Sequence, residues 1–220
     1  MSLWIKICGN TSLADAQLAA EAGADAVGFV FAPSPRRITP EQVAAIVPQL
    51  PPGLEKIGVF VDASFNEITL AVENCGLTGV QLHFDALREL PIRLRARLGP
   101  RIRILRVVHF DGGGATAAFY PKSASSVDAI LIDSRTTYAV GGTGVPFDWS
   151  AARSVFEQFG QDRNLIAAGG LTPENVTEAI TTLHPWGVDV VTGVEAEPGR
   201  KDPARVRAFI ANARAAGQGK

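Results

Sequence analysis

The stretch Leu165-Ile166-Ala167-Ala168-Gly169-Gly170-Leu171-Thr172-Pro173-Glu174 runs from the end of one predicted element into the start of the next. Its first four residues are continuously apolar, which is typical of a strand buried on both faces of a parallel sheet. Two glycines then form a loop. Thr172, followed by Pro173 and Glu174, predicts a helix start with threonine as the N-cap. The stretch therefore contains the strand, loop and helix start of an α/β fold.

Apolar runs of strand length recur along the whole chain. Most of them are separated by segments with helical periodicity, and Thr39-Pro40-Glu41 repeats the pattern of a helix start. The segment Gly112–Ser126 has no clear periodicity, so the helix expected there is short or irregular. The eight predicted strands are Trp4–Cys8, Ala26–Phe31, Lys56–Val61, Gly79–Leu82, Ile102–Val108, Ala129–Asp133, Leu165–Ala168 and Val188–Thr192.

Eight strands that alternate with helices predict an α/β protein with a (β/α)8 barrel. Three similar segments, at 23–27, 126–130 and 187–191, each read as a helix exit followed by a strand entry, which supports one repeated unit. No linker divides the chain, so residues 1–220 are expected to form a single domain with little decoration. A doubly wound open sheet is the alternative, but its G-x-G-x-x-G fingerprint is absent after the first strand.

The composition narrows the functional classes. The chain has 21 Lys and Arg against 22 Asp and Glu, without long runs of either sign, so neither a nucleic-acid nor a membrane partner is expected. No signal peptide or apolar run of about 18 residues is present, which favours a cytoplasmic protein. Two cysteines and three histidines lack the spacing of a disulfide framework or metal site, so no metal is expected.

The carboxyl ends of the strands carry chemically active residues. In a barrel these ends face one mouth, so residues far apart in the sequence converge there. The first strand places Cys8 at this mouth, the fourth places His83 and the sixth places Asp133. The loop after the second strand adds Arg36 and Arg37. The sequence therefore predicts a site that combines a thiol, an imidazole, a carboxyl group and an anion clamp.

Glycine-bearing loops follow the sixth, seventh and eighth strands. Glycine lets backbone N–H groups approach a phosphate closely, and the last two loops form the usual phosphate site of such barrels. A small phosphorylated substrate is the predicted ligand. The alternative is that Asp133 only caps its loop and the glycines only turn the chain. The candidate phosphate-binding residues are Gly142, Gly144, Gly169, Gly170, Gly193 and Val194.

Several motifs, in order over nearly the whole chain, resemble the phosphoribosylanthranilate isomerase family. The opening Lys6-Ile7-Cys8-Gly9 together with the run from Gly141 to Gly144 and Phe147-Asp148-Trp149 is the more specific part. The other matching motifs are Gly28-Phe29-Val30-Phe31 with Ser34-Pro35-Arg36, Gly58-Val59-Phe60-Val61, Val80-Gln81-Leu82-His83, the stretch from Ala168 to Val176, and Gly193-Val194-Glu195 through Pro198-Gly199 to Lys201-Asp202.

The resemblance implies a cofactor-free Amadori rearrangement in tryptophan biosynthesis. N-(5-phosphoribosyl)anthranilate becomes 1-(2-carboxyphenylamino)-1-deoxyribulose 5-phosphate. By their match to the family motif, Asp133 is the general acid that opens the ribose ring and Cys8 is the general base that removes the C2 proton. An unperturbed cysteine, with a pKa of about 8.5, is mostly protonated at neutral pH. The site is therefore expected to favour the thiolate, with Lys6 or strand-end dipoles as candidate sources.

The same resemblance assigns substrate contacts. Arg36 matches the family's contact to the anthranilate carboxylate, where a planar bidentate donor suits a planar anion, and Arg37 is expected to be a solvated neighbour. His83 and Asp189 fall where the family has polar residues near the substrate. Their alternatives are a structural histidine and an aspartate that orients a loop. Cys75, in a helix end, is expected to be structural.

Two other functions compete with this interpretation. One is a related sugar isomerase of histidine biosynthesis, which is expected to pair two aspartates at strand ends where this chain has Cys8 and Asp133. The other is a barrel that binds a phosphorylated ligand without catalysis, which would need neither of these groups. Ala32 and Phe84 depart from the family pattern and bear on substrate fit. Monomer and homodimer both remain open.

Overall fold

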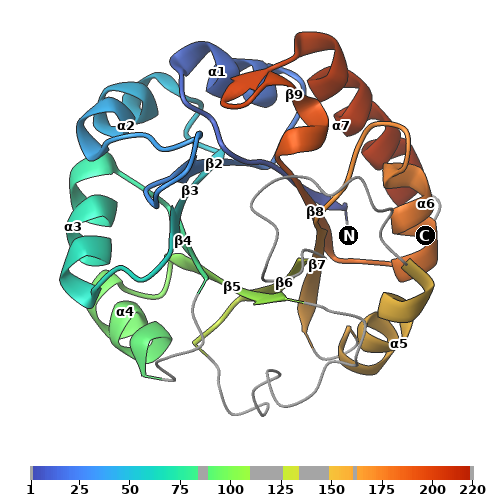
Figure 1. Cartoon of the computed structure of the whole chain (residues 1–220). Helices are drawn as coiled ribbons and strands as arrows, with labels where there is room; N and C mark the ends of the chain where they lie inside the picture. The colour runs from blue at the N-terminus through green and yellow to red at the C-terminus, as the bar shows by residue number, and fades with distance from the viewer. Residues whose placement is uncertain (1, 84–88, 110–125, 134–148, 161–162, 219–220) are drawn as a thin grey trace.

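The computed structural model describes residues 2–83, 89–109, 126–133, 149–160 and 163–218. Within these residues eight parallel strands close into a barrel in chain order, and the first pairs with the eighth. Figure 1 shows the ring of strands with helices around it. The (β/α)8 barrel is confirmed, and the open-sheet alternative is wrong. The strands are β1 Trp4–Ile7, β2 Ala26–Val30, β3 Glu55–Phe60, β4 Gly79–Leu82, β5 Arg103–His109, β6 Ala129–Asp133, β7 Asn164–Ala168 and β8 Gly187–Val190.

The helices of the described residues cover the outside of the barrel, and none is long and apolar enough to cross a membrane. A small hairpin, β9 and β10, lies between β8 and the last helix. The helix expected after β5 falls largely on residues 110–125, outside the described residues. The remaining elements are α1 Leu13–Glu21, α2 Pro40–Ile46, η1 Val47–Gln49, α3 Phe65–Cys75, α4 Leu90–Leu98, α5 Trp149–Phe159, α6 Val176–Leu183, η2 Thr192–Val194, β9 Glu195–Glu197, β10 Arg200–Lys201 and α7 Pro203–Gly217.

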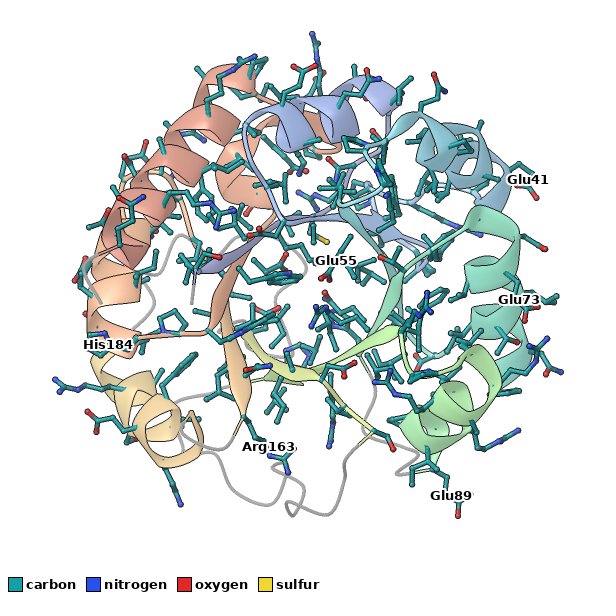
Figure 2. The ribbon with its side chains drawn as sticks, turned by 180° about the vertical axis from the view of Figure 1, so that it is seen from behind. Glu41, Glu55, Glu73, Glu89, Arg163 and His184 are labelled. Carbon is teal, nitrogen blue, oxygen red and sulfur yellow. The ribbon has the colours of Figure 1, made fainter. Side chains whose placement is uncertain are left out.

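The strands are buried on both faces, as their continuously apolar sequences predict. In β5, Leu105 and Val107 join a cluster inside the barrel, whereas Ile104 and Val108 join the larger cluster between the strands and the helices. Each such side chain contributes about 1.5–3 kcal/mol when fully buried. Figure 2 shows the ring from behind, with Glu41 and Glu73 at its outer edge. Several polar residues of the barrel strands are buried as well, among them Lys6, Gln81 and Asp189.

The two Thr-Pro-Glu sequences behave differently. Thr39 is the N-cap of α2, and its hydroxyl accepts a hydrogen bond from the backbone of Gln42, whose side chain binds back to Thr39. The prediction that Thr172 is an N-cap is wrong, because α6 begins at Val176 with Asn175 as its N-cap. There the Thr172 hydroxyl accepts from the backbone of Glu174, only two residues on, which makes a turn before the helix.

Candidate active site

A cavity of about 250 Å³ opens at the carboxyl ends of the strands. Cys8 lines it after β1, and His83 lines it after β4. Asp133 at the end of β6 and Asp189 in β8 add carboxyl groups. Arg36 completes the set from the loop after β2. The structure therefore brings together every side chain that the sequence places in the catalytic or substrate-contact group.

Cys8 is packed against a position that has no side chain. A Cβ at Gly28 would lie 2.5 Å from Cys8 Sγ, so glycine leaves room for the thiol. Burial raises the pKa of the Cys8 thiol, although the positive charges of Lys6 and Lys201 oppose this rise. Burial and the two cations therefore act in opposite directions on the thiol, and burial is the larger effect. The expectation that the site favours the thiolate stays a prediction, and Lys6 is among the charges that act in its favour.

Lys6 is fully buried beside Cys8 inside the barrel. Its Nζ donates to Asp189 Oδ1 at 2.8 Å and to Gln81 Oε1 at 2.8 Å. Lys6 and Asp189 face each other in the register of β1 and β8, which explains how residues far apart in the sequence meet. Burial disfavours the charge, but Asp189 and Cys8 outweigh it and raise the pKa of Lys6. The ammonium group is therefore a fixed positive charge beside the thiol.

Gln81 extends this chain of contacts to the cavity. Its Nε2 lies 2.9 Å from Nε2 of His83. The two residues are two positions apart, so their side chains share one face of the strand. The His83 ring in turn lies 6.1 Å, centroid to centroid, from that of His109. His109 ends β5 and is paired in register with Asp133, so it lies at the mouth although the sequence indicates no role for it.

Arg36 is held by a carboxylate at the rim of the cavity. Its Nε donates to Glu195 Oε1 at 2.9 Å, and its Nη2 donates to Glu195 Oε2 at 2.7 Å. The neighbouring Arg37 is exposed, as predicted. The hydrogen bonds that Arg36 donates to Glu195 raise the pKa of Arg36, so the guanidinium group is always charged. Arg36 can therefore present a permanent cation to an anionic ligand.

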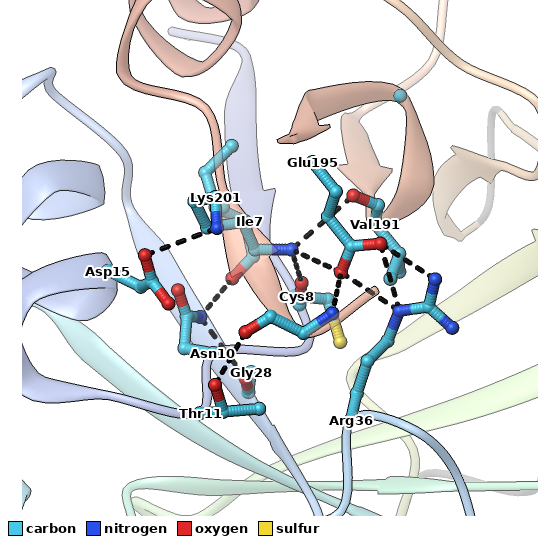
Figure 3. A network of polar contacts seen from close by, with 12 residues as sticks. Ile7, Cys8, Asn10, Thr11, Asp15, Gly28, Arg36, Val191, Glu195 and Lys201 are labelled. Carbon is cyan, nitrogen blue, oxygen red and sulfur yellow. Dashed lines mark hydrogen bonds and ion pairs between the residues drawn. The ribbon is translucent and has the colours of Figure 1, made fainter. Parts of the chain in front are cut away.

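Glu195 also contacts a second buried cation, Lys201. Lys201 Nζ lies 3.3 Å from Glu195 Oε1 and donates to the backbone carbonyl of Cys8 at 2.6 Å. Burial alone would raise the pKa of Glu195, but Arg36 and Lys201 bring it below its usual value. Figure 3 shows the network, in which Glu195 lies between Arg36 and Lys201. The arrangement joins the arginine at the rim to the strand end that carries Cys8.

The glycine loops fall into three groups. Gly169 and Gly170 line the cavity, and both have positive φ angles, 84° and 63°, that glycine adopts readily. Gly193 and Val194 are buried in η2 and do not line it; a Cβ at Gly193 would clash with the backbone oxygen of Leu171. The backbone of η2 therefore packs against the loop after β7. The two remaining candidates, Gly142 and Gly144, lie outside the described residues.

No role was assigned from the sequence to three polar residues that join the contacts around this cavity, namely Gln81, Glu195 and Lys201. Gln81 carries a local signal, because it precedes His83 by two residues and so shares its face of the strand. Glu195 and Lys201 flank the Pro198-Gly199 turn, but Glu195 binds Arg36, 159 residues away, and Lys201 binds the carbonyl of Cys8, 193 residues away. No local pattern predicts such partners. Cys75 is buried in α3 with its Sγ 3.3 Å from the Pro40 carbonyl oxygen, consistent with a structural role.

The fold and this site together define a class of protein. A closed (β/α)8 barrel whose mouth gathers a thiol, carboxyl groups, an imidazole and a held arginine is the arrangement of a barrel enzyme that moves protons on an anionic substrate. Every one of these groups comes from a strand end or the loop after it, where barrel enzymes place their catalytic residues.

A family model for N-(5'phosphoribosyl)anthranilate (PRA) isomerase matches residues 5–212. The N-(5'-phosphoribosyl)anthranilate isomerase of Geotalea uraniireducens is 44% identical over 211 residues, which cover 96% of this chain and 98% of that protein. The chain belongs to the phosphoribosylanthranilate isomerase family. The resemblance found in the sequence is therefore confirmed, and the histidine-pathway alternative is set aside.

Solved structures agree with this assignment. A phosphoribosylanthranilate isomerase in complex with reduced 1-(o-carboxyphenylamino)-1-deoxyribulose 5-phosphate is 37% identical, with a TM-score of 0.81 over 97% of this chain and 99% of that chain. Monomers generated from the dimeric isomerase of Thermotoga maritima are 36% identical, with a TM-score of 0.76 over 97% and 99%. A dimer therefore exists among the relatives, and the oligomeric state of this chain stays a prediction.

Proposed function

We propose that this chain converts N-(5'-phosphoribosyl)anthranilate into 1-(o-carboxyphenylamino)-1-deoxyribulose 5-phosphate, with Asp133 as general acid and Cys8 as general base. The family assignment supports the reaction. The observation that carries the roles is that Cys8 and Asp133, from β1 and β6, line one cavity. A barrel that only binds a phosphorylated ligand would have no need of this pair.

Asp133 would begin the reaction at the ribose ring. Its carboxyl group donates a proton to the ring oxygen while the C1–O bond breaks. The anilino nitrogen supplies the electron pair for a C1=N bond, so the product of this step is a cationic iminium. Asp133 ends β6 and is buried, with 8% of its surface exposed, so it can approach the substrate with little competing water.

Cys8 would then act on the iminium. The thiol loses its proton to water, and the thiolate removes the C2 proton. The electrons of the C–H bond form the C1=C2 bond and neutralise the nitrogen, giving an enolamine that tautomerises to the ketose. The positive charges of Lys6 and of the iminium both favour the thiolate. The cationic intermediate would therefore promote loss of the thiol proton and offset the effect of burial on the pKa of Cys8.

The two ends of the substrate would be held by different groups. The Arg36 guanidinium suits the planar anthranilate carboxylate, because parallel N–H groups match two carboxylate oxygens. His83 and Asp189, which line the same cavity, would contact the sugar. The phosphate would bind beside the loops after β7 and β8, where Gly169, Gly170 and Thr192 line the cavity and the glycine backbone lets N–H groups approach an anion.

The test is the loss of anthranilate fluorescence as freshly prepared N-(5'-phosphoribosyl)anthranilate is consumed. We expect rapid loss with the unmodified protein. Cys8→Ser and Asp133→Asn should each lower kcat at least ~100-fold, the range for removal of a general acid or base. Cys75→Ser is the matched control, because Cys75 is equally buried but lies in α3.

Two results would contradict the proposal. If the unmodified protein leaves the fluorescence unchanged, the barrel that only binds a ligand becomes the better interpretation. If Cys8→Ser retains ordinary turnover while the substrate is consumed, the reaction stands but the base is another group. Competition by inorganic phosphate checks the phosphate site separately, and its absence at high concentration would count against the two loops.

A further inference from the structure

We propose that Glu195 is a positioning residue for the carboxylate end of the substrate. It holds the Arg36 guanidinium in the orientation that receives the carboxylate, and through Lys201 it ties this clamp to the backbone of Cys8. The inference rests on the proposed function, because it concerns the same site. It assigns Glu195 no contact with the substrate, and its effect is expected to pass through Arg36.

The hydrogen bonds decide which edge of Arg36 remains available. Glu195 accepts from Nε at 2.9 Å and from Nη2 at 2.7 Å, so it occupies the side edge of the guanidinium group. In the described part of the chain Nη1 has no hydrogen-bond partner, and the second N–H of Nη2 is directed away from Glu195 by the planar geometry. These N–H groups form the end edge, which remains free for a second carboxylate. Arg36 lines the cavity, so the ligand can reach it.

Lys201 offsets the negative charge of Glu195, which would otherwise repel the carboxylate of the substrate. A substrate carboxylate bound to Arg36 would lie near the Glu195 carboxylate, and like charges disfavour binding. Lys201 lies 3.3 Å from Glu195, so the three joined side chains carry a formal charge of +1. One carboxylate from the ligand neutralises this cluster. The nearby Asp15 binds the backbone N–H of Lys201 and lies in the first turn of α1, where a helix N-terminus favours a negative charge.

The surroundings hold Glu195 still. Only 4% of its side-chain surface is exposed, and the backbone N–H of Gly199 also donates to Oε1 at 3.3 Å. Lys201 is fully enclosed and donates to the carbonyl of Cys8 at 2.6 Å. A long arginine side chain loses much freedom when it is held at one angle. With Glu195 in place, Arg36 loses this conformational entropy when the protein folds. The loss then does not reduce the affinity for the substrate.

The experiment measures binding of two ligands, so that positioning is separated from general damage. The first is reduced 1-(o-carboxyphenylamino)-1-deoxyribulose 5-phosphate, and the second is the same compound without the carboxyl group. We expect Glu195→Gln to weaken binding of the first about tenfold or more and to leave binding of the second unchanged. Glu197→Gln is the matched control, because Glu197 lies in the same strand but is exposed and, among the described residues, forms an ion pair only with Arg200 at 3.5 Å.

A double variant tests whether Glu195 acts through Arg36. Arg36→Ala should weaken binding of the carboxylated ligand, and adding Glu195→Gln should weaken it no further. Multiplying effects would overturn the inference, as would equal weakening for both ligands, which is the mark of a purely structural role. If Glu195→Gln does not fold, Glu195→Asp, which keeps the charge but has a shorter reach, must show the same carboxylate-specific loss.

The outcomes also distinguish this inference from the function beneath it. If the unmodified protein binds neither ligand, the proposed function fails. If Arg36→Ala binds the carboxylated ligand normally, the carboxylate clamp fails, and the inference fails with it. If Arg36→Ala weakens binding and Glu195→Gln does not, only the positioning role of Glu195 is wrong.

Discussion

Two buried lysines near Cys8 have opposite charge preferences. Lys6 inside the barrel has a pKa above its ordinary value, whereas Lys201 behind the rim has a pKa below it. Both are almost completely enclosed, with 0% and 3% of their surfaces exposed, and both form an ion pair with one carboxylate. Burial itself therefore does not explain the difference.

The difference lies in how the carboxylate is shared. Asp189 lies 2.8 Å from Lys6, and no second cation is recorded on it in the described part of the chain. Glu195 lies 3.3 Å from Lys201 and is also bound to Arg36. Burial has the largest effect and lowers the pKa of Lys201. The Glu195 carboxylate raises this pKa, and the positive charge of Arg36 lowers it. A carboxylate that serves two cations stabilises each of them less.

The largest expected effect comes from Lys6→Met. This change leaves Asp189 buried without its cation, which typically costs ~3–5 kcal/mol, and it removes the positive charge beside Cys8. We expect kcat to fall at least ~100-fold and the urea midpoint of unfolding to drop. The measurements are the fluorescence assay and urea unfolding.

Lys56→Met is the control for this prediction. Lys56 is also buried and also lies in a strand, but its Nζ donates to the Pro51 carbonyl at 2.7 Å and not to a carboxylate. It should lose less stability and retain turnover. Equal losses in the two variants would show that a buried lysine matters for its packing and not for the charge that it supplies.

A smaller effect than that of Lys6→Met on turnover is expected in the pH dependence of Cys8 alkylation by iodoacetamide. This measurement compares the influence of Lys6 and of Lys201 on the thiol. Burial raises the pKa of the thiol, so the alkylation rate should increase with pH, and this increase should occur at higher pH than for an ordinary cysteine. Lys6 opposes this rise more than Lys201 does. We therefore expect Lys6→Met to move the curve to higher pH by more than Lys201→Met does. A larger shift in Lys201→Met would reverse the ranking.

The smallest effect should appear in the free energy of unfolding at alkaline pH. A difference of one pKa unit between the folded and unfolded states corresponds to about 1.4 kcal/mol. The raised pKa of Lys6 gives stability that is complete below pH 10.5 and is lost as the pH rises through the folded value. The lowered pKa of Lys201 means that the unfolded chain binds more protons, so its contribution grows as the pH rises towards 10.5. Removing each lysine should therefore change the slope in opposite directions. The same slope change in both variants would contradict the comparison.

The sequence predicted the barrel and the convergence at its mouth because both depend on local patterns. Apolar runs indicate strands, and a strand end fixes where Cys8 and Asp133 emerge. The charge state of Cys8 could not be predicted, because it depends on burial and on two lysines that approach it in space. Thr172 shows the same limit at a smaller scale: it shares Thr-Pro-Glu with Thr39, but the fourth residue is asparagine instead of glutamine, and the helix begins later.

The pairing of β1 with β8 also orders events during synthesis. Lys6 in β1 and Cys8 directly after it are made more than 180 residues before Asp189, Glu195 and Lys201. Until those residues emerge, the backbone carbonyl of Cys8 lacks the Lys201 ammonium group that donates to it, and Lys6 lacks the Asp189 carboxylate. Domains generally fold as units, and this unit lacks its last seam until nearly the whole barrel has been made. A nascent chain that stalls before β8 would therefore carry Cys8, the proposed base, without the charged groups that surround it in the complete barrel.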